Sequence, residues 1–324
     1  MTLLWNAVHG HFNITVVPQG GGGAGADDYP GKPIRFIVPF AQGGPGDILA
    51  RLIGCNLAQS WGQPVLIENH PGAGGTIGTE IGARSLPDGH TLILAASTHA
   101  INPSLYAKLP YDTVKDFQPV TLMISMPNIL VVNPFVAVDS VDDLIAFARS
   151  NPGRLKYASG GIGTPSHLGA ELLKTMAGID IVHVQFNGHA SAGAALQKGE
   201  VSMMFDAILL ALPEVRAGKV KALAVTSAKR SAVAREVPTV AESGLPGFDF
   251  SPGVGMLVRA GTPSAIVNKL YKEVERILRL PDVRERLASD GAEIIGSSPG
   301  EYTAYMDREF AKWAEVVRAS GIRT

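Results

Sequence analysis

Cysteine and strong charge of either sign are scarce in this 324-residue sequence. Cys55 is the only cysteine, so the chain forms no disulfide within itself and has no thiolate cage for a metal. We expect Cys55 to lie buried on the apolar face of the first helix. Because the net charge is −1, the chain has no basic field to hold nucleic acid or anionic lipid.

Long apolar runs are missing as well, since none approaches the roughly 20 residues that span a bilayer. We therefore expect no direct membrane insertion, and we expect no metal and no cofactor. Nothing in the sequence indicates an obligate oligomer, so a monomer is expected. Abundant glycine and proline, 37 and 22 residues, are typical of a turn-rich α/β protein, and the length favours two domains.

The first 26 residues differ from the rest. They end in a glycine run followed by Ala24-Gly25-Ala26, which has the small-x-small form of a signal-peptidase site. A basic start is lacking and the apolar stretch is interrupted. We interpret 1–26 as a leader or an expression-derived segment, and expect the first domain to begin near Tyr29.

A glycine loop follows the first predicted strand. The β-branched run that ends at Pro39 opens into Gly43 and Gly44, and Asp47 stands where a helix begins. In an α/β sheet such a loop lies at the carboxyl end of a strand, and the helix N-terminus favours an anion. The alternative is that the glycines only form a connection.

A second glycine loop, residues 72–78, fits neither a Walker loop nor a dinucleotide fingerprint, so nucleotide binding is not expected. The buried strand 90–96 ends at Ser97 and Thr98, small hydroxyl residues at a ligand-binding position. Residues 102–112 are predicted to form a surface excursion. The apolar strands 117–125 and 128–133 are predicted to cross into a second domain.

The strand–glycine loop–helix unit recurs at residues 155–168. The loop contains Ser159, Gly161 and Gly163, and Thr164 followed by a proline predicts an N-cap and a first helical residue. Its helix N-terminus is a second candidate anion site. His167 in the first turn is either a ligand contact or a packed side chain.

Two further strands end in polar residues. Asn187 and His189 follow the strand 181–186, in which His183 is expected to be a core residue. Asp206 ends the strand 202–206 and is a catalytic base, an acceptor for a ligand or a helix cap. Residues 252–258 are predicted to re-enter the first domain, and the last helix, 299–320, carries an apolar stripe expected to pack against it.

Signatures of catalysis are missing. The sequence has no Gly-x-Ser-x-Gly, His-Glu-x-x-His or Cys-x-x-Cys motif. The loops share small residues, hydroxyls and glycine amides instead. That inventory fits binding an anion better than converting one.

Several motifs, in order along the chain, resemble one family. They are Tyr29-Pro30-Gly31-Lys32-Pro33-Ile34-Arg35, Glu68-Asn69-His70-Pro71-Gly72-Ala73-Gly74-Gly75, Pro87-Asp88-Gly89, Gly161-Ile162-Gly163-Thr164, Met204-Phe205-Asp206 and Val237-Pro238-Thr239. As a set they resemble the substrate-binding proteins of tripartite tricarboxylate transporters, also called Bug receptors. The resemblance covers about residues 29–322.

The resemblance implies a type II periplasmic binding protein fold, in which two α/β lobes close around a small carboxylate. The expected domains are 27–125 with 252–324, and 126–251. It also implies a periplasmic location and delivery of the ligand to a membrane permease. The candidate ligand-binding residues are Phe40, Gln42, Gly43, Gly44, Asp47, Ser97, Thr98, Ser159, Gly161, Gly163, Thr164, His167, Asn187, His189 and Asp206.

The sequence departs from the family pattern near the expected ligand. His70 replaces a usual arginine, and Gln185, Asn187 and His189 stand where proline, lysine and glycine are frequent. The leading hypothesis is a receptor for a di- or tricarboxylate or an aromatic acid, held by the amides and hydroxyls of 159–164. The alternatives are a cytoplasmic carboxylate sensor and an α/β enzyme that uses Asp206 or His167 as a base.

Overall fold

The computed structural model describes residues 28–321. Its strands are β1 (Ile34–Val38), β2 (Val65–Asn69), β3 (Thr91–Ala95), β4 (Phe117–Ser125), β5 (Asn128–Val132), β6 (Lys156–Ser159), β7 (Val182–Gln185), β8 (Met203–Ala207), β9 (Lys221–Val225), β10 (Gly253–Arg259) and β11 (Glu293–Ile294). Its helices are α1 (Pro45–Trp61), η2 (Ala73–Gly75), α2 (Thr76–Ala83), α3 (Ser97–Leu105), α4 (Val141–Ser150), α5 (Pro165–Ala177), α6 (His189–Gln197), α7 (Ile208–Arg216), α8 (Ser264–Leu278), α9 (Pro281–Ser289) and α10 (Pro299–Ser320). The predicted leader, 1–26, lies outside the described residues.

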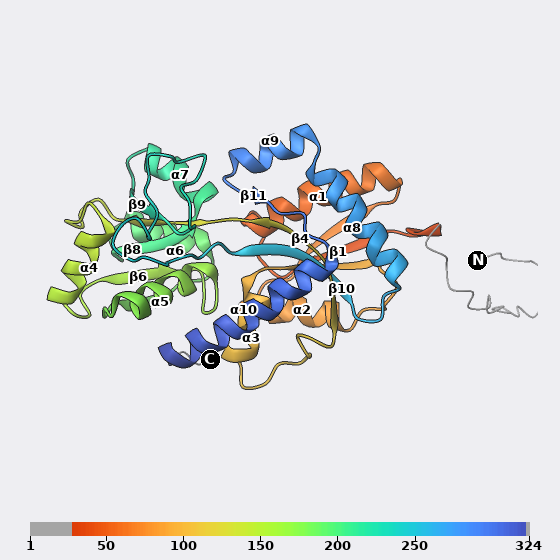
Figure 1. Cartoon of the computed structure of the whole chain (residues 1–324), viewed down its shortest axis with the longest axis horizontal. Helices are drawn as coiled ribbons and strands as arrows, with labels where there is room; N and C mark the ends of the chain where they lie inside the picture. Colours follow the sequence, from red (N-terminus) through yellow and green to blue (C-terminus); the bar gives the residue numbers. More distant parts are fainter. Residues whose placement is uncertain (1–27, 322–324) are drawn as a thin grey trace, which may run out of the picture.

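The strands form two separate sheets. A six-stranded sheet has the order β11-β4-β10-β3-β1-β2, and we call it, with its helices, lobe 1. A five-stranded sheet has the order β7-β6-β8-β5-β9, and with α4 to α7 it forms lobe 2. Figure 1 shows the two lobes side by side, with the helices around each sheet. The predicted two-lobe α/β fold is confirmed.

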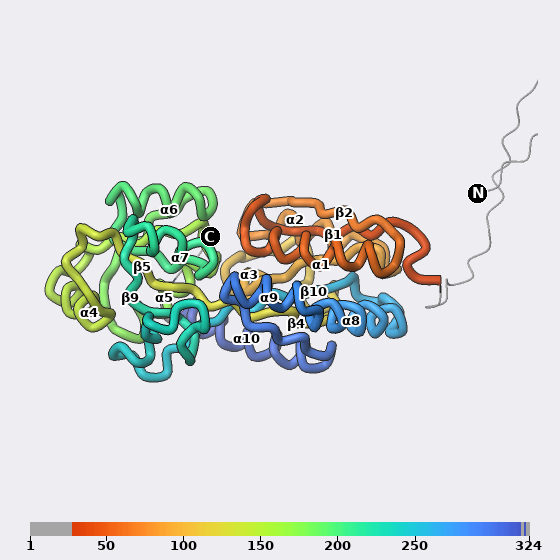
Figure 2. The backbone as a smooth tube through the Cα atoms, turned by 90° about the horizontal axis from the view of Figure 1, so that it is seen from above, coloured from red at the N-terminus to blue at the C-terminus, as the bar shows by residue number. Residues whose placement is uncertain are grey.

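Two crossing segments join the lobes, residues 126–127 and 226–252. They are hydrogen-bonded to each other, because Met126 N donates to Pro252 O at 3.0 Å. Asn128 N also donates to Thr226 Oγ1 at 2.8 Å. Figure 2 shows these segments between the lobes. Two crossing segments bonded in this way can serve as a hinge for motion of the two lobes.

Local sequence signals define two of the helices fully. Ser140 caps α4 by accepting a hydrogen bond from Asp143 N. In α10 the side chain of Ser298 and that of Glu301 form a capping box. By contrast, Thr164 is the N-cap residue of α5 but makes no side-chain cap bond.

The C-terminal helix α10 packs more widely than predicted. Its buried residues Tyr302, Met306 and Trp313 face the core as expected. The helix contacts α3 and β4 of lobe 1 but also α5 of lobe 2, and Trp313 packs edge-on against Phe250 at 5.4 Å between ring centroids. Packing against the first domain alone was therefore an incomplete prediction.

Three expectations were wrong or incomplete. Residues 102–105 belong to the buried helix α3 rather than to a surface excursion. The helix α7 and the short strand β11 were not predicted. Cys55 is exposed, because the buried stripe of α1 runs through Leu49, Ile53 and Leu57, and residue 55 lies off it.

Candidate functional site

The candidate ligand loops lie at one edge of each sheet. In lobe 1 the strands β1, β2 and β3 are parallel, so all three end at the same edge. In lobe 2 the strands β6, β7 and β8 are likewise parallel. We call these the carboxyl edges. The end of β4 and the start of β10 lie at the carboxyl edge of lobe 1, and the start of β5 lies at that of lobe 2, so the crossing segments connect the two edges.

Asp47 holds the first glycine loop in shape. The residue is 2% exposed, and Oδ2 accepts hydrogen bonds from Gly43 N at 2.9 Å and from Arg51 Nε at 3.0 Å. Burial alone would raise the pKa of Asp47, but these bonds and one from Asn69 outweigh it and lower the pKa. Asp47 is therefore a buried anion that fixes the loop, with its oxygens engaged inside lobe 1.

The other candidate residues of the loop 40–47 lie close to Asp47 in the chain. Gly44 is the N-cap residue of α1, and Gln42 and Gly43 are exposed. Phe40 is half-buried, and its carbonyl accepts a hydrogen bond from Asn69 Nδ2 at 3.1 Å. Asn69 also donates to Asp47 Oδ1 at 3.0 Å. The asparagine of the Glu-Asn-His-Pro motif thus ties the loop to the end of β2.

Ser97 and Thr98 open helix α3 at the carboxyl edge of lobe 1. They are 5% and 3% exposed, and α3 has no side-chain cap. The hydroxyl oxygen of Ser97 is buried without a hydrogen-bond partner. A buried polar group left unpaired costs free energy, so this hydroxyl is a candidate to hydrogen-bond a ligand.

The loop Ser159–Thr164 lies at the carboxyl edge of lobe 2 and is bonded internally. Its backbone amides donate from Gly160 to Ser166 Oγ at 3.1 Å, from Gly161 to Ser159 Oγ at 3.2 Å, from Gly163 to His167 Nδ1 at 3.1 Å and from Thr164 to Gly161 O at 3.2 Å. The Thr164 hydroxyl donates to Gly161 O at 2.6 Å. These four amides and the Thr164 hydroxyl already donate hydrogen bonds within the protein. In this arrangement they are therefore not available to bind an anion.

Histidine side chains lie directly beneath this loop. Ser159 is fully buried, and its Oγ lies 2.6 Å from His183 Nε2. His167 is 2% exposed, so both residues face the interior of lobe 2 rather than solvent. His183 was expected to be a core residue. It is half-buried, and it also bonds to Ser159 of the loop.

Asp206 and His189 form a pair at the same edge. His189 Nδ1 lies 2.9 Å from Asp206 Oδ1, which also accepts a hydrogen bond from Ala207 N at 2.8 Å. The helix that follows, α7, has no side-chain cap, so Asp206 is not a helix cap. Asn187 is exposed beside them.

The two carboxyl edges are in direct contact. A methyl group added at Gly163 would lie 2.8 Å from Leu105 Cδ1 of lobe 1, and one added at Gly74 would lie 3.6 Å from Ile162 O of lobe 2. Across the molecule, Gly291 similarly meets Ile208 of α7. The structure thus brings the loop 159–164 against the C-terminal part of α3, at Asn102 and Leu105.

Sequence reasoning missed two asparagines near these edges. Asn102 of α3 is 1% exposed with an unpartnered Oδ1, and Asn128, the first residue of β5, is 3% exposed with an unpartnered Nδ2. Asn128 lies opposite Ala207 in the sheet, next to Asp206. A polar residue heading the apolar run 128–132 at a predicted crossing was the signal that could have found it.

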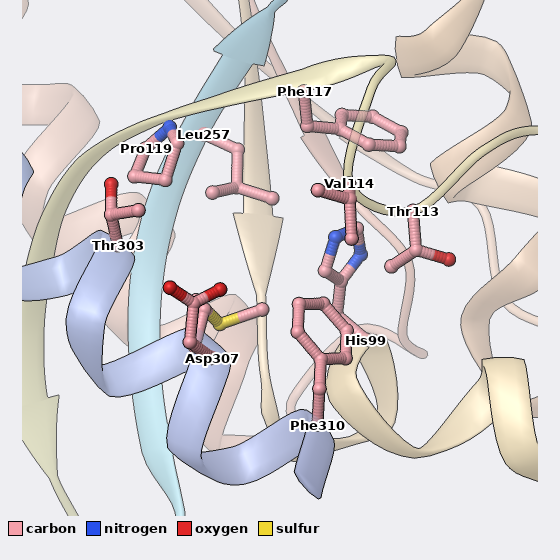
Figure 3. Close-up of a pocket in the computed structure, with 10 residues that line it drawn as sticks. His99, Thr113, Val114, Phe117, Pro119, Leu257, Thr303, Asp307 and Phe310 are labelled. Carbon is pink, nitrogen blue, oxygen red and sulfur yellow. The ribbon is translucent and has the colours of Figure 1, made fainter.

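Two cavities lie elsewhere. One, of about 60 Å³, lies between α10, β4 and α3, and Figure 3 shows His99 and Phe117 facing Asp307 and Phe310 across it. It is far below the roughly 300 Å³ at which ligand pockets begin. The other, of about 590 Å³, is lined by residues of α8, α9 and β11, including Arg279 and Arg284. The candidate ligand residues line neither cavity.

Within residues 28–321, no helix is both long and apolar enough to cross a bilayer. The same residues contain no group of three or more His, Cys, Asp or Glu side chains arranged to hold a metal ion.

Comparison with known proteins gives consistent matches. The family model for the tripartite tricarboxylate transporter family receptor matches residues 49–322. Protein BugT of Bordetella pertussis is 36% identical over 300 residues, covering 92% of this chain and 92% of that protein.

Solved structures agree along nearly the whole chain. R. palustris Rpa4515 with adipate has a TM-score of 0.87 and 35% identity, and the match covers 92% of this chain and 100% of that one. MatC (Rpa3494) from Rhodopseudomonas palustris with bound malate has a TM-score of 0.82 and 38% identity, with coverage of 89% and 100%. The chain therefore belongs to the tripartite tricarboxylate transporter receptor family, whose members are solute-binding proteins and not enzymes.

Proposed function

We propose that the ligand of this receptor is a small organic dicarboxylate, bound between the two carboxyl edges. The observation that carries the proposal is the buried, unpartnered hydroxyl of Ser97 at the uncapped N-terminus of α3. A helix N-terminus with a free hydroxyl favours a carboxylate. The adipate and malate in the related structures support this ligand class.

The ends of the ligand have different partners in this proposal. One carboxylate binds at Ser97 and Thr98 on lobe 1. The other extends toward His189 of lobe 2, whose Nδ1 is held by Asp206 at 2.9 Å. Such a carboxylate partner fixes the orientation of the imidazole.

The remaining candidate residues shape the loops in this proposal. Asp47 fixes the loop 40–47, and the bonds within 159–164 fix the loop that meets α3. Because the ligand touches both lobes only when they are together, its binding favours the closed arrangement. We propose that the units that move are 27–125 with 252–324, and 126–251.

The biological setting follows from the family. We propose that the protein acts as a monomer in the periplasm and passes its ligand, chemically unchanged, to the permease of a tripartite transporter. The enzyme alternative is set aside because the family consists of receptors. The remaining alternative is a cytoplasmic carboxylate sensor.

A thermal-shift screen against mono-, di- and tricarboxylic acids and aromatic acids tests the proposal. At a hundred times its dissociation constant, a ligand adds about 2.7 kcal/mol to stability, which is readily visible as a higher melting temperature. We expect dicarboxylates to give the largest shifts and to be recovered intact. Stabilisation by monocarboxylates alone, or by no acid, would contradict the proposal.

A further inference from the structure

The loop 159–164 is bonded to a histidine of α5, a role of His167 that the sequence alone does not indicate. His167, in the first turn of α5, turns back under the loop, and its Nδ1 accepts a hydrogen bond from Gly163 N at 3.1 Å. A neutral imidazole has one acceptor nitrogen, so the proton of His167 is on Nε2. Gly163 is the residue that meets Leu105 of lobe 1. The histidine therefore holds the point of the loop that touches the other lobe.

A second histidine completes the support. The ring of His183 stacks on that of His167, with 4.2 Å between centroids, and its Nε2 lies 2.6 Å from Ser159 Oγ. Tyr157 stacks against both rings, with its centroid 4.9 Å from that of His183 and 6.2 Å from that of His167. The two imidazoles thus bond to Ser159 and to Gly163 of the same loop, and their rings pack on each other.

We infer that His167 and His183 are positioning residues for ligand binding: they hold the loop 159–164 in the shape that meets lobe 1, and His167 does so only as the neutral imidazole. The ligand part of this inference rests on the proposed function. Neither histidine needs to touch the ligand, since both act through the loop.

The surroundings of the pair favour the neutral form. Burial, and then the nearby His183 and Lys174, lower the pKa of His167 to about 3. Burial likewise lowers the pKa of His183. Other facing groups are Tyr157 of β6, whose hydroxyl donates to Glu171, and Lys174, which pairs with Glu171 at 3.1 Å. Phe205 of β8 faces the same helix, and on α10 Lys312 pairs with Glu309.

The sign of the pH dependence follows. The folded-state pKa of His167 is below its ordinary value of 6.5, so its contribution to stability is fully present above pH 6.5. The contribution is lost as the pH falls from 6.5 toward 3. At neutral pH the ring is uncharged and accepts the Gly163 amide.

The test compares two substitutions at one position. Asparagine places an uncharged acceptor near the position of Nδ1, whereas leucine fills space without one. We expect His167→Asn to bind the best dicarboxylate of the screen within about threefold of the unmodified protein. We expect His167→Leu to bind it at least about tenfold more weakly, because a buried amide loses its acceptor. His90→Asn, a half-buried histidine of lobe 1 whose Nδ1 also bonds to backbone, is the matched control.

Two readouts do not need a ligand. Hydrogen exchange at the Gly163 amide, followed by NMR, should be slow in the unmodified protein and in His167→Asn, and faster in His167→Leu. Between pH 6.5 and 3 the melting temperature should fall more steeply for the unmodified protein than for His167→Asn.

Each outcome decides the matter. Equal exchange and equal affinity in His167→Leu and the unmodified protein would overturn the inference, and so would a His167→Asn variant as impaired as the leucine variant. If the unmodified protein binds no acid, the proposed function fails, and the exchange data still decide whether His167 holds the loop.

Discussion

At the scale of single residues, the most informative group is the hydroxyl of Ser97. It is buried, unpartnered and placed at the start of a helix that faces the other lobe. A stable protein rarely leaves such a group without a bond unless a bound molecule supplies one. In the proposed site, a ligand carboxylate supplies the missing hydrogen bond.

Replacing this serine should separate stability from binding. We expect Ser97→Ala to leave the stability of the unbound protein unchanged or raise it by up to about 1 kcal/mol, and to weaken dicarboxylate binding about five- to tenfold. Thermal unfolding and calorimetric titration measure the two effects. Thr239→Val is the control, because Thr239 Oγ1 is buried and already accepts a bond from Glu242 N. It should lower stability without changing affinity, and the same pattern in Ser97→Ala would contradict this account.

For single residues, the sequence predicted positions at loop ends but not the side-chain partners. Asp47 and Asp206 were found by their position at loop ends, which depends only on local pattern. That Asp47 also bonds to Asn69, and that Asp206 pairs with His189, depends on segments 22 and 17 residues apart in the sequence. A single sequence does not encode those distances in any local pattern.

At the scale of elements, β1 and β2 are joined by an ion pair as well as by their ladder. Arg35 of β1 donates two hydrogen bonds, each 2.7 Å, to the carboxylate of Glu68 on β2. The bond from Arg35 is the main cause that lowers the pKa of Glu68 from 4.5 to about 2, and His70 adds to it. The motif that contains Glu68 and Asn69 thus fixes both the strand pair and the first ligand loop.

This ion pair predicts a pH dependence. Because the folded-state pKa of Glu68 is depressed, its contribution to stability is present above pH 4.5 and is lost as the pH falls toward 2. Glu68→Gln should cost about 1 kcal/mol at pH 7 and flatten the acid limb of the stability curve between pH 4.5 and 2. Chemical denaturation across this range measures it. Glu80→Gln, which removes an exposed pair with Arg84, is the control, and equal acid limbs in all three proteins would count against the assignment.

Elements with strong local signals were predicted well, and the others were not. The start of α4 follows from the cap at Ser140 and the start of α10 from its first residue, a proline; the bounds of α10 agree with the predicted range 299–320. Helices α3 and α7 each contain a proline, Pro103 and Pro213, which argues against a helix in a local pattern. Tertiary packing overrides that signal, and β11 has too few residues to show any periodicity.

At the scale of the whole molecule, the described structure places the loop 159–164 directly on lobe 1. A side chain at Gly163 would require Leu105 to shift, since a methyl group there would lie 2.8 Å from Leu105 Cδ1. Gly163 also has φ of +77°, which disfavours any other residue. Both observations favour glycine at this position.

Gly163→Ala should hinder closure and weaken ligand binding about tenfold. Calorimetric titration gives the affinity, and small-angle scattering gives the compaction on ligand binding, which should be smaller in the variant. Gly178→Ala is the matched control, because Gly178 has a similar φ of +61° at the other end of α5 with nothing within 4 Å. It should bind ligand as the unmodified protein does. Equal losses in both variants would mean that backbone strain, and not the contact with Leu105, limits binding.

The most direct test of the central claim is a calorimetric titration with the best diacid of the screen and with its monoamide, in which one carboxylate is replaced by an uncharged amide of similar size. If each carboxylate has its own partner on one lobe, the diacid should bind at least about tenfold more tightly than the monoamide and be recovered unchanged. Equal affinity for the two compounds, or no measurable binding of any diacid, would contradict a dicarboxylate receptor with partners on both lobes.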